Sequence, residues 1–379
     1  MAIRNLTDIC DIQYGFAFDA SGFTTAADEG MPLVRIRDVM NGRTETYFKG
    51  NYPKEYIIHK GDFLVGMDGE FNIAPWKSDD ALLNQRVCRV KSNQSGVSTK
   101  FLFWFLKKEL KRIEEETPFV TVKHLSAKRL KQVQLEVPPI EEQEKIVAEL
   151  DCLTGIIEKK KQQLEELDKL GQSIFYDLFG DPITNEKGWV KKKIGSFSSC
   201  LAGATPSTTH EEYWENGTIP WLSSGEVGKG RIYGTEKRIT QVGYESCSTR
   251  LVPAHTLVIA MAGQGKTRGT AGVAEIPLCT NQSICSIIPN EKVALVDFLY
   301  YQMQQMYKDL RSISNGDGGR GGLNLKLIGN YPVIVPPLSL QNEFTQKIEA
   351  IEKQKELVKQ SIIETETLFN SRMDFWFNN

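Results

Sequence analysis

The stretch "EVPPIEEQEKIVAEL" occupies residues 136–150, and "IVPPLSLQNEFTQKI" occupies residues 334–348. Both place Val-Pro-Pro before a glutamine, Gln143 or Gln341, and a long charged segment. Proline is tolerated in the first turn of a helix but not in its interior, so each Pro-Pro pair predicts the start of a helix. The chain therefore carries the same strand-to-helix junction twice.

The junction belongs to a repeat that covers the whole chain. "MPLVRIRDV" at residues 31–39 matches "IPWLSSGEV" at 219–227, and "NQRVCRV" at 84–90 matches "NQSICSI" at 281–287. The offset grows from 188 to 198 residues, as expected when insertions fall in loops. The repeat predicts a first globule at residues 1–136, a spacer helix at 137–180, a second globule at 181–334 and a C-terminal spacer helix at 335–379.

Each half contains the same order of elements. Short β-type runs such as "DFLVGM" and "TLVIAMA" are separated by Gly, Asn and Asp turn signals. An aromatic helix, an irregular loop and a strand that ends at Pro-Pro follow. This order predicts two similar α+β globules of about 135–150 residues each.

The segments after the Pro-Pro pairs have a heptad pattern. Apolar residues alternate at spacings of four and three from Ile146 to Leu178, interrupted by Lys160 and Gly171, and recur in this way after Phe344. Such a narrow seam favours one partner helix, although a single amphipathic helix on its own globule is an alternative. Two matched helices in one duplicated chain favour an antiparallel, coiled-coil-like pair. The predicted fold is α+β, with two globules separated by these helices in a pseudo-twofold internal repeat.

The composition is typical of a globular protein in a reducing compartment. Of 379 residues, 40% are hydrophobic and 25% charged, and the seven cysteines lack CxxC or disulfide-like spacing. The sequence shows no apolar signal core and no membrane span, so we expect a cytoplasmic protein. The formal net charge is −2, but residues 141–170 and 338–379 together carry −6, which leaves +4 for the remainder. Mildly basic globules are compatible with nucleic-acid binding.

Motifs for catalysis or metal binding are incomplete. "AMAGQGKT" at residues 260–267 fits a loose phosphate-loop pattern, but "RGTAGVAEIP" follows in place of the helix that such a loop needs. "VPPI" and "VPPL" lack the residues with which adenine methyltransferases hold a target base. The four histidines are scattered, and no Ser-His-Asp or Cys-His set is apparent. The sequence therefore predicts a chain without catalytic residues, bound metal or cofactor of its own.

"VPPIEEQEKIVAELD", the helix that runs to "SIFYDLFGDPITNEKGWVKKKIGSF" and the second "VPPLSLQNEF" resemble the specificity subunits of type I restriction–modification systems. The resemblance covers essentially the whole chain. The second junction has "SLQNE" where the first has "EEQEK", so Gln143 and Gln341 are the shared feature. The resemblance implies two target-recognition domains, each reading one half of a split DNA sequence.

The resemblance also implies partners. Two methyltransferase subunits would dock on the helices, with Gln143 and Gln341 as docking candidates at the helix junctions, and restriction subunits would supply helicase and nuclease activity. S-adenosylmethionine, ATP and Mg²⁺ would be cofactors of these partners, in a bacterial or archaeal cytoplasm.

Candidates for base reading lie in loops whose chemistry differs between the halves. "VGMDGEFNIAPWKSDDALL" and "AMAGQGKTRGTAGVAEIPLC" hold corresponding positions but share almost no loop residues. Polar and charged side chains can read base edges, although for each residue simple exposure to solvent is an open alternative. The candidates are Arg35, Arg37, Glu70, Asn72, Lys77, Lys123 and His124 in the first globule, and Ser223, Glu226, Gln264, Lys266, Arg268 and Arg320 in the second. Asn84-Gln85 and Asn281-Gln282 recur in both halves, so we expect them to satisfy the backbone of the frame.

Two other functions stay open at the level of sequence. A two-headed scaffold could grip a symmetric protein partner without DNA specificity, and a phosphate-loop ATPase would show turnover that Lys266→Ala removes. DNA binding would be distinguished by its steep weakening with salt, because phosphate contacts release counterions.

Overall fold

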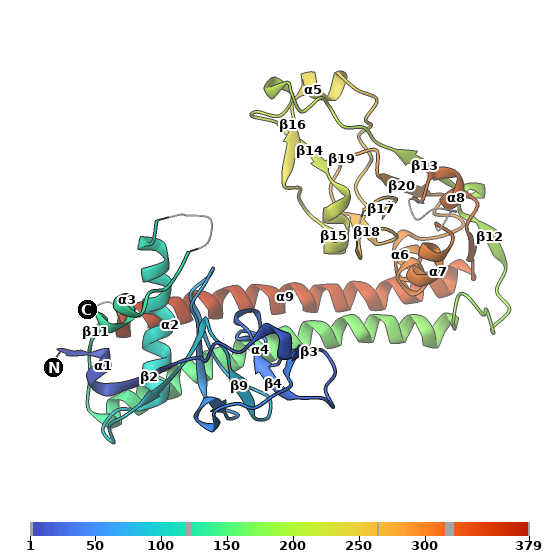
Figure 1. The fold of residues 1–379 in the computed structure, drawn as a ribbon. Helices are drawn as coiled ribbons and strands as arrows, with labels where there is room; N and C mark the ends of the chain where they lie inside the picture. Colours follow the sequence, from blue (N-terminus) through green and yellow to red (C-terminus); the bar gives the residue numbers. More distant parts are fainter. Residues whose placement is uncertain (1–2, 119–122, 264, 315–321, 378–379) are drawn as a thin grey trace. The chain divides into compact units, whose positions relative to one another are not determined.

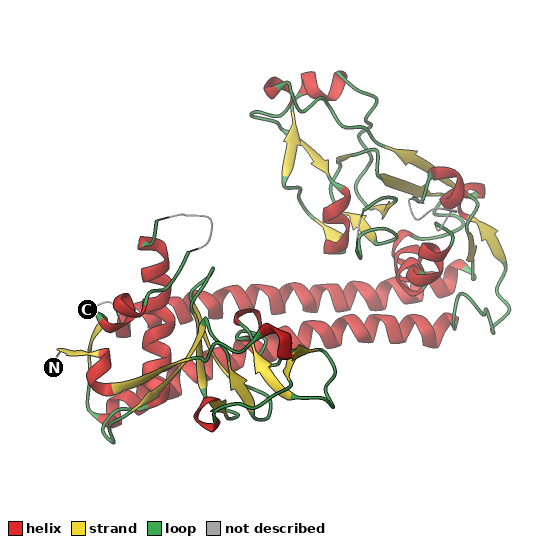
Figure 2. Ribbon diagram, viewed as in Figure 1, coloured by secondary structure: helices red, strands yellow, loops and turns green. Residues whose placement is uncertain are grey.

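The computed structural model describes residues 3–118, 123–263, 265–314 and 322–377, and it divides into two compact units (Figure 1). Unit 1 comprises Met1–Lys161 and Ser361–Asn379, and unit 2 comprises Gln162–Gln360. Each unit contains one α+β globule and a part of each of two long helices (Figure 2). The units cut across the four predicted segments because each globule packs on both helices.

Unit 1 contains two small sheets and one further strand pair. The first sheet has the order β2-β10-β7-β8, formed by Cys10–Tyr14, Val87–Ser92, Phe63–Gly66 and Asn72–Pro75. The second has the order β3-β5-β4-β9-β6, formed by Phe23–Thr24, Tyr47–Phe48, Met31–Val34, Ala81–Leu83 and Ile57–Ile58. Strand β1 (Ile3–Asn5) pairs with β11 (Gln134–Glu136), which ends at the first Pro-Pro.

Helix α2 (Thr99–Glu116) supplies the aromatic core of unit 1. Ser98 caps it, since its hydroxyl accepts a hydrogen bond from the Phe101 N–H at 3.4 Å. The run from Phe101 to Leu106 is buried, which confirms the predicted aromatic helix. The remaining short elements are α1 (Leu6–Ile9), α3 (Ala127–Lys131), η1 (Ala20–Gly22), η2 (Ile36–Asp38) and η3 (Lys54–Tyr56).

Unit 2 repeats this plan. Its larger sheet has the order β13-β20-β17-β18-β15, formed by Ser198–Ala202, Ile284–Pro289, Thr256–Ala260, Ala271–Ala274 and Arg231–Ile232. Its smaller sheet has the order β16-β14-β19, formed by Lys237–Ile239, Ile219–Leu222 and Cys279–Thr280. Strand β12 (Lys191–Lys193) pairs with β21 (Pro332–Ile334), which precedes the second Pro-Pro.

The helices of unit 2 differ in one respect from the prediction. The expected aromatic helix breaks at Met306 into α6 (Val296–Gln305) and α7 (Tyr307–Ser312). The other short elements are α5 (Gln241–Glu245), α8 (Leu325–Gly329), η4 (Ile194–Ser196), η5 (Glu211–Tyr213) and η6 (Ser224–Lys229).

Strand registers confirm the internal repeat. Leu33 pairs with Leu82 in the parallel pair β4–β9, and Trp221 pairs with Cys279 in the parallel pair β14–β19. Leu33 and Trp221 are 188 residues apart in sequence, and Leu82 and Cys279 are 197 residues apart. The offset between the halves therefore grows along the chain, as the sequence predicts. The pairs at the Pro-Pro junctions repeat in the same way, with Ile3 opposite Glu136 and Lys191 opposite Ile334.

The recurrent Asn-Gln pairs belong to this shared frame, as expected. The Asn84 side-chain oxygen accepts a hydrogen bond from the Gln85 N–H at 2.9 Å, and that of Asn281 accepts one from the Ser283 N–H at 3.0 Å. A glycine packs closely against the backbone at each Asn-Gln pair. A Cβ added to Gly15 would lie only 2.0 Å from the Asn84 carbonyl oxygen, so no other residue fits there. The equivalent distance from Gly203 to the carbonyl oxygen of Thr280 is 1.8 Å.

The helices after the Pro-Pro pairs are α4 (Ile140–Phe179) and α9 (Leu338–Phe377), of 40 residues each. In unit 1, Lys160 of α4 donates to Ser361 of α9 at 2.5 Å, and the Trp376 indole N–H donates to Glu149 at 2.9 Å. In unit 2, Lys355 of α9 forms an ion pair with Asp168 of α4 at 2.7 Å, and the rings of Phe344 of α9 and Phe179 of α4 lie 5.5 Å apart. Rising residue numbers on α4 therefore meet falling numbers on α9, so the helices run antiparallel within each unit.

The two interruptions of the heptad seam have structural reasons. The ammonium group of Lys160 donates a hydrogen bond to the Ser361 hydroxyl. Gly171 has no side chain, and the Tyr301 side chain packs against it. A Cβ on Gly171 would lie 2.7 Å from the Tyr301 hydroxyl. Beyond Gly171, Phe175 and Phe179 are fully buried, whereas the predicted seam residues Ile174 and Leu178 are partly buried.

A short helix stands in each loop that was expected to be irregular. The Ser126 hydroxyl accepts a hydrogen bond from the Arg129 N–H at 3.2 Å and caps α3. The Asn324 side chain accepts one from the Leu327 N–H at 2.9 Å and caps α8. Because Ser and Asn are favoured N-cap residues, this local signal could have predicted both helices.

Candidate nucleic-acid interface

In unit 1, the loop between β7 and β8 meets the loop after α2. The Leu125 N–H donates to the Met67 carbonyl at 2.7 Å, and the Gly69 N–H donates to the Lys123 carbonyl at 2.9 Å. The Nδ1 atom of His124 lies 2.5 Å from the Oδ1 atom of Asp68. These contacts place the candidates Glu70, Lys123 and His124 together on one loop cluster.

The side chains of this cluster differ in their exposure to solvent and in their hydrogen bonds. Glu70 and His124 are exposed, whereas Lys123 is half-buried and donates to the Glu114 carbonyl at 2.7 Å. Arg86, which sequence reasoning missed, lies 3.4 Å from both Asp68 and His124. No motif marks Asp68 or Arg86, because the loops that carry them approach His124 only in the folded chain.

Arg35, Arg37 and Asn72 lie near the same end of β7. Arg35 and Arg37 are exposed and flank Ile36, and a Cβ on Gly66 would lie 3.2 Å from the Ile36 side chain. Asn72 faces Gly66 across the β7–β8 ladder. Its side-chain oxygen is buried over Gly66 without a hydrogen-bond partner among the described residues, so a base could reach it only if the side chain turned outward.

Lys77 belongs to a different loop contact. It is exposed, and its N–H donates to the Gly42 carbonyl at 3.3 Å. The described contacts therefore connect Lys77 with the loop that follows η2 and not with the cluster around His124.

In unit 2, Ser223 and Glu226 form a capping box on η6. The Ser223 N–H and hydroxyl donate to the Glu226 carboxylate at 3.2 and 3.0 Å, and the Glu236 N–H donates to it at 2.9 Å. Glu226 is 3% exposed and also pairs with Lys229 at 3.1 Å. The structure thus corrects the prediction for Glu226, whose oxygens are occupied by the frame. The spacing Ser-x-x-Glu is the sequence signal that indicates such a cap.

The loop after β17 carries the second group of candidates. The Leu323 N–H donates to the Met261 carbonyl at 3.0 Å, which repeats the contact between Leu125 and Met67. Lys266 is exposed and Arg268 is half-buried. Gln264 and Arg320 lie outside the described residues.

Helix α7 fixes this loop through its backbone. The Tyr307 hydroxyl donates to the Lys266 carbonyl at 2.8 Å, and the Arg311 guanidinium donates to the Gly265 carbonyl at 2.7 Å. The Lys266 side chain is therefore presented from an anchored loop. Turns and then strand β18 follow Thr267, so no helix begins there, and the phosphate-loop hypothesis is wrong.

Gln143 and Gln341 lie at the helix junctions, and both are fully buried. The side-chain oxygen of Gln143 accepts from the Ser98 N–H at 2.8 Å, and its amide donates to the Pro138 carbonyl at 2.8 Å. Gln341 makes the equivalent bonds with the Leu295 N–H at 2.9 Å and the Pro336 carbonyl at 2.8 Å. A role in docking a partner stays a prediction, and a buried amide could exert it only through the junction that it holds.

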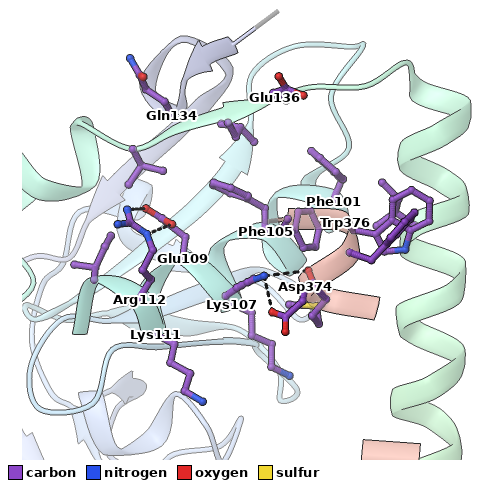
Figure 3. Close-up of a pocket in the computed structure, with 18 of the residues that line it drawn as sticks. Phe101, Phe105, Lys107, Glu109, Lys111, Arg112, Gln134, Glu136, Asp374 and Trp376 are labelled. Atoms are coloured by element: carbon purple, nitrogen blue, oxygen red, sulfur yellow. Dashed lines mark hydrogen bonds and ion pairs between the residues drawn. The ribbon is translucent and has the colours of Figure 1, made fainter. Parts of the chain in front are cut away.

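A groove of unit 1 lies elsewhere, between α2 and the last turns of α9 (Figure 3). Phe101, Phe105 and Trp376 line it, and some of its charges are paired, as in the contact of Glu109 with Arg112 at 2.6 Å and of Lys108 with Asp374 at 2.7 Å. None of the described residues that line it is a base-reading candidate. Its geometry indicates a seam where the end of α9 packs on the globule.

Residues 3–118, 123–263, 265–314 and 322–377 contain no group of three or more His, Cys, Asp or Glu side chains arranged to hold a metal ion. Within the same ranges, none of the helices has the length and apolar character needed to cross a membrane.

Comparisons with known proteins agree on one family. The model of the type I restriction modification DNA specificity domain matches residues 1–169 and 186–367. The specificity subunit of the type I restriction enzyme EcoBI of Escherichia coli is 28% identical over 378 residues, which cover 92% of this chain and 78% of that protein. The specificity subunit of EcoR124I/EcoR124II of E. coli is 28% identical over 209 residues, which cover 54% and 50% of the two chains.

The fold is also similar to that of a solved structure. The S subunit of a type I restriction–modification system from M. genitalium aligns with a TM-score of 0.57 and 16% identity, covering 98% of this chain and 94% of that one. The family match confirms the resemblance in the Pro-Pro junctions, and the relatives are named as specificity subunits of enzymes. The chain belongs to the type I restriction modification DNA specificity family.

Proposed function

We propose that this chain is the non-catalytic specificity subunit of a type I restriction–modification complex and that each globule reads one half of a bipartite DNA target. The single observation that carries this proposal is a common frame with different loops. Strand registers repeat between the units, but the loop between β7 and β8 spans residues 67–71 and its counterpart after β17 spans residues 261–270. Two globules with the same strand framework but different loops can read two different half-sequences, because the contacts that specify bases come from the loops.

The helices supply the second part of the proposal. Helices α4 and α9 form an antiparallel pair that separates the globules about a pseudo-twofold axis, sets the gap between the half-sites and holds two methyltransferase subunits. Restriction subunits join this complex in a bacterial or archaeal cytoplasm. S-adenosylmethionine, ATP and Mg²⁺ act in the partners, and this chain contributes no cofactor site. A scaffold without DNA specificity is not favoured, because the matching family model is a DNA specificity domain.

The test is methylation of a DNA library with two randomised half-sites and a randomised gap. The complex of the full chain with its methyltransferase subunits should select two fixed sequences separated by one gap. Arg35→Ala should relax base preference in one half, and Lys266→Ala should affect the other half or weaken binding uniformly. Methylation without a bipartite consensus would contradict the proposal, as would DNA binding that is insensitive to salt.

A further inference from the structure

Unit 2 contains a cavity of about 320 Å³, lined by residues of α6, of the turn between η6 and β15 and of the two long helices. Tyr300 and Tyr301 of α6 line it together with Gly230, Arg231 and Glu352. None of the described residues that line it is a base-reading candidate. The proposed function therefore gives this cavity no role.

The two tyrosine hydroxyls at this cavity are unused hydrogen-bond donors. Tyr300 is 6% exposed and Tyr301 is 3% exposed, yet neither hydroxyl forms a hydrogen bond with a described residue. Burial raises the pKa of both phenols, so each hydroxyl keeps the proton that it can donate. Because buried polar groups are normally paired, two unpaired hydroxyls on one cavity wall point to a ligand that accepts hydrogen bonds.

The equivalent place in unit 1 is filled by the chain itself. Tyr301 corresponds to Trp104 at an offset of 197 residues, and Gly171 corresponds to Phe369 at an offset of 198. In unit 1 the Trp104 and Phe369 rings lie 5.6 Å apart, and the Lys107 ammonium lies 4.9 Å from the Trp104 ring. In unit 2 a glycine stands in place of the phenylalanine. The shared frame therefore does not require this cavity or its hydroxyls.

The lining of the cavity has an excess of positive charge. Its acidic residues are already paired, because Lys355 lies 2.7 Å from Asp168 and 2.9 Å from Glu352. Four of the described lining residues are basic and two are acidic, namely Lys229, Arg231, Lys355 and Lys359 against Asp168 and Glu352.

Lys359 is the cation that this arrangement leaves available. Its counterpart Lys161 pairs with Glu366 at 2.9 Å in unit 1. The residue that corresponds to Glu366 is Asp168, which pairs with Lys355 instead. Lys359 is exposed and has no ion-pair partner among the described residues.

Two neutral donors and one ammonium group select the class of ligand. A phosphate group has several strong acceptor oxygens and carries a charge of about −1.5 to −2 at pH 7, so it suits this set of donors. The hydroxyls belong to buried residues, so a ligand that reaches them must enter the cavity, and a DNA duplex is too wide to do so.

We propose that the cavity of unit 2 binds a phosphate group, either free or on a small molecule, through the hydroxyls of Tyr300 and Tyr301 and the ammonium of Lys359. This site lies beyond the proposed function, because it involves neither the DNA-reading loops nor a partner subunit. A bound ligand contacts α6 and α9 together, so it stabilises unit 2 by mass action.

The experiment measures binding of inorganic phosphate and of phenyl phosphate to the full chain by calorimetry, in chloride buffers of constant ionic strength. We expect one saturable site. Tyr300→Phe and Tyr301→Phe keep the rings and should each weaken it by about tenfold, and Lys359→Gln should do the same. Tighter binding of phenyl phosphate would identify a phosphate ester as the ligand, and equal or weaker binding would identify the free ion.

Two matched variants are the controls. Tyr176→Phe removes the hydroxyl of a tyrosine on α4 that is 53% exposed and does not line the cavity. Lys161→Gln removes the charge that corresponds to Lys359 in the other half. Both controls should bind the probes as the unaltered chain does.

Three results would overturn the proposal and leave the specificity function standing. The first is the absence of a saturable site for either probe, and the second is equal affinity in the cavity variants and the controls. The third is binding of a short DNA duplex that depends on Tyr300 and Tyr301. Thermal unfolding without ligand checks that each variant is folded, and Lys359→Gln keeps the test decisive because its side chain is exposed.

Discussion

At the scale of single residues, the two junction glutamines do the same structural work. Each buried amide joins the N-terminus of an aromatic helix to a Pro-Pro carbonyl, and Gln143 also donates to the Gly96 carbonyl at 3.0 Å. Glutamine suits this place because one planar group accepts and donates at once. Its recurrence in both halves therefore reflects the fold before any contact with a partner.

Gln143→Ala should reduce the free energy of unfolding by about 2–4 kcal/mol, because it leaves the Ser98 N–H and the carbonyls of Gly96 and Pro138 without their partner. Urea unfolding followed by circular dichroism would measure the loss. Glu144→Ala, at the next and exposed position, is the control and should change stability by less than about 0.5 kcal/mol. Equal stability of both variants would contradict a structural role for Gln143.

His255 gives unit 2 a predictable dependence on pH. Hydrogen bonds to Asp297 and Glu275 raise the pKa of its imidazole to about 10. The folded form therefore keeps its proton where the unfolded form, with a pKa near 6.5, loses it. This stabilisation is fully present below pH 6.5 and is lost as the pH rises through about 10.

The stability advantage of the unaltered chain over His255→Gln should accordingly shrink between about pH 7 and pH 10. Comparing the two unfolding free energies at each pH cancels the titration of groups that both proteins share. An advantage that stays constant, or grows with pH, would show that His255 is not held protonated by Asp297 and Glu275.

At the scale of elements, two glycines within α4 should respond to alanine with opposite signs. Glycine in a helix interior normally costs about 0.5–1 kcal/mol relative to alanine. A Cβ on Gly155 meets no atom within 4 Å, whereas one on Gly171 would meet the Tyr301 hydroxyl at 2.7 Å and its ring at 2.8 Å. Tertiary packing therefore outweighs helix propensity at Gly171.

Gly155→Ala should raise the free energy of unfolding by about 0.5–1 kcal/mol, and Gly171→Ala should lower it by about 1–3 kcal/mol. Thermal unfolding of the two single variants would show the difference. Stabilisation by both would mean that Tyr301 moves aside without cost and does not hold α6 against α4.

At the scale of the whole molecule, the proposed function implies that the length of the helices sets the gap between the two DNA half-sites. A helix of 40 residues is about 60 Å long at about 1.5 Å per residue. Deleting one heptad from each helix, residues 158–164 and 357–363, keeps the apolar seam in phase and shortens each helix by about 10 Å. The preferred gap should shrink by up to about 3 base pairs, with both half-sequences unchanged.

The measurement is methylation of the randomised library by the complex of the shortened chain. Deleting only five residues from each helix is the control, because at about 100° per residue it rotates the apolar seam by about 140° and should impair folding. An unchanged gap would mean that the helices do not set the spacing. Altered half-sequences with an unchanged gap would mean that the helices help to read bases.

The sequence by itself determined the repeat, the α+β class, both helix starts and the family. These features depend on local signals, such as Pro-Pro junctions and heptad spacing, or on matches between segments that survive without knowledge of contacts. The absence of a phosphate loop also followed from the residues next to Lys266, because the required helix would have to begin there.

Tertiary structure alone decided which polar residues are available. Lys123 and His124 are neighbours in sequence, yet Lys123 is half-buried and donates to the Glu114 carbonyl, whereas His124 is exposed. Asp68, Arg86 and His124 are distant in sequence and meet only because strands and loops are brought together by the fold. Availability depends on burial and on hydrogen bonds made across the chain, and neither quantity is a property of a residue's sequence neighbours.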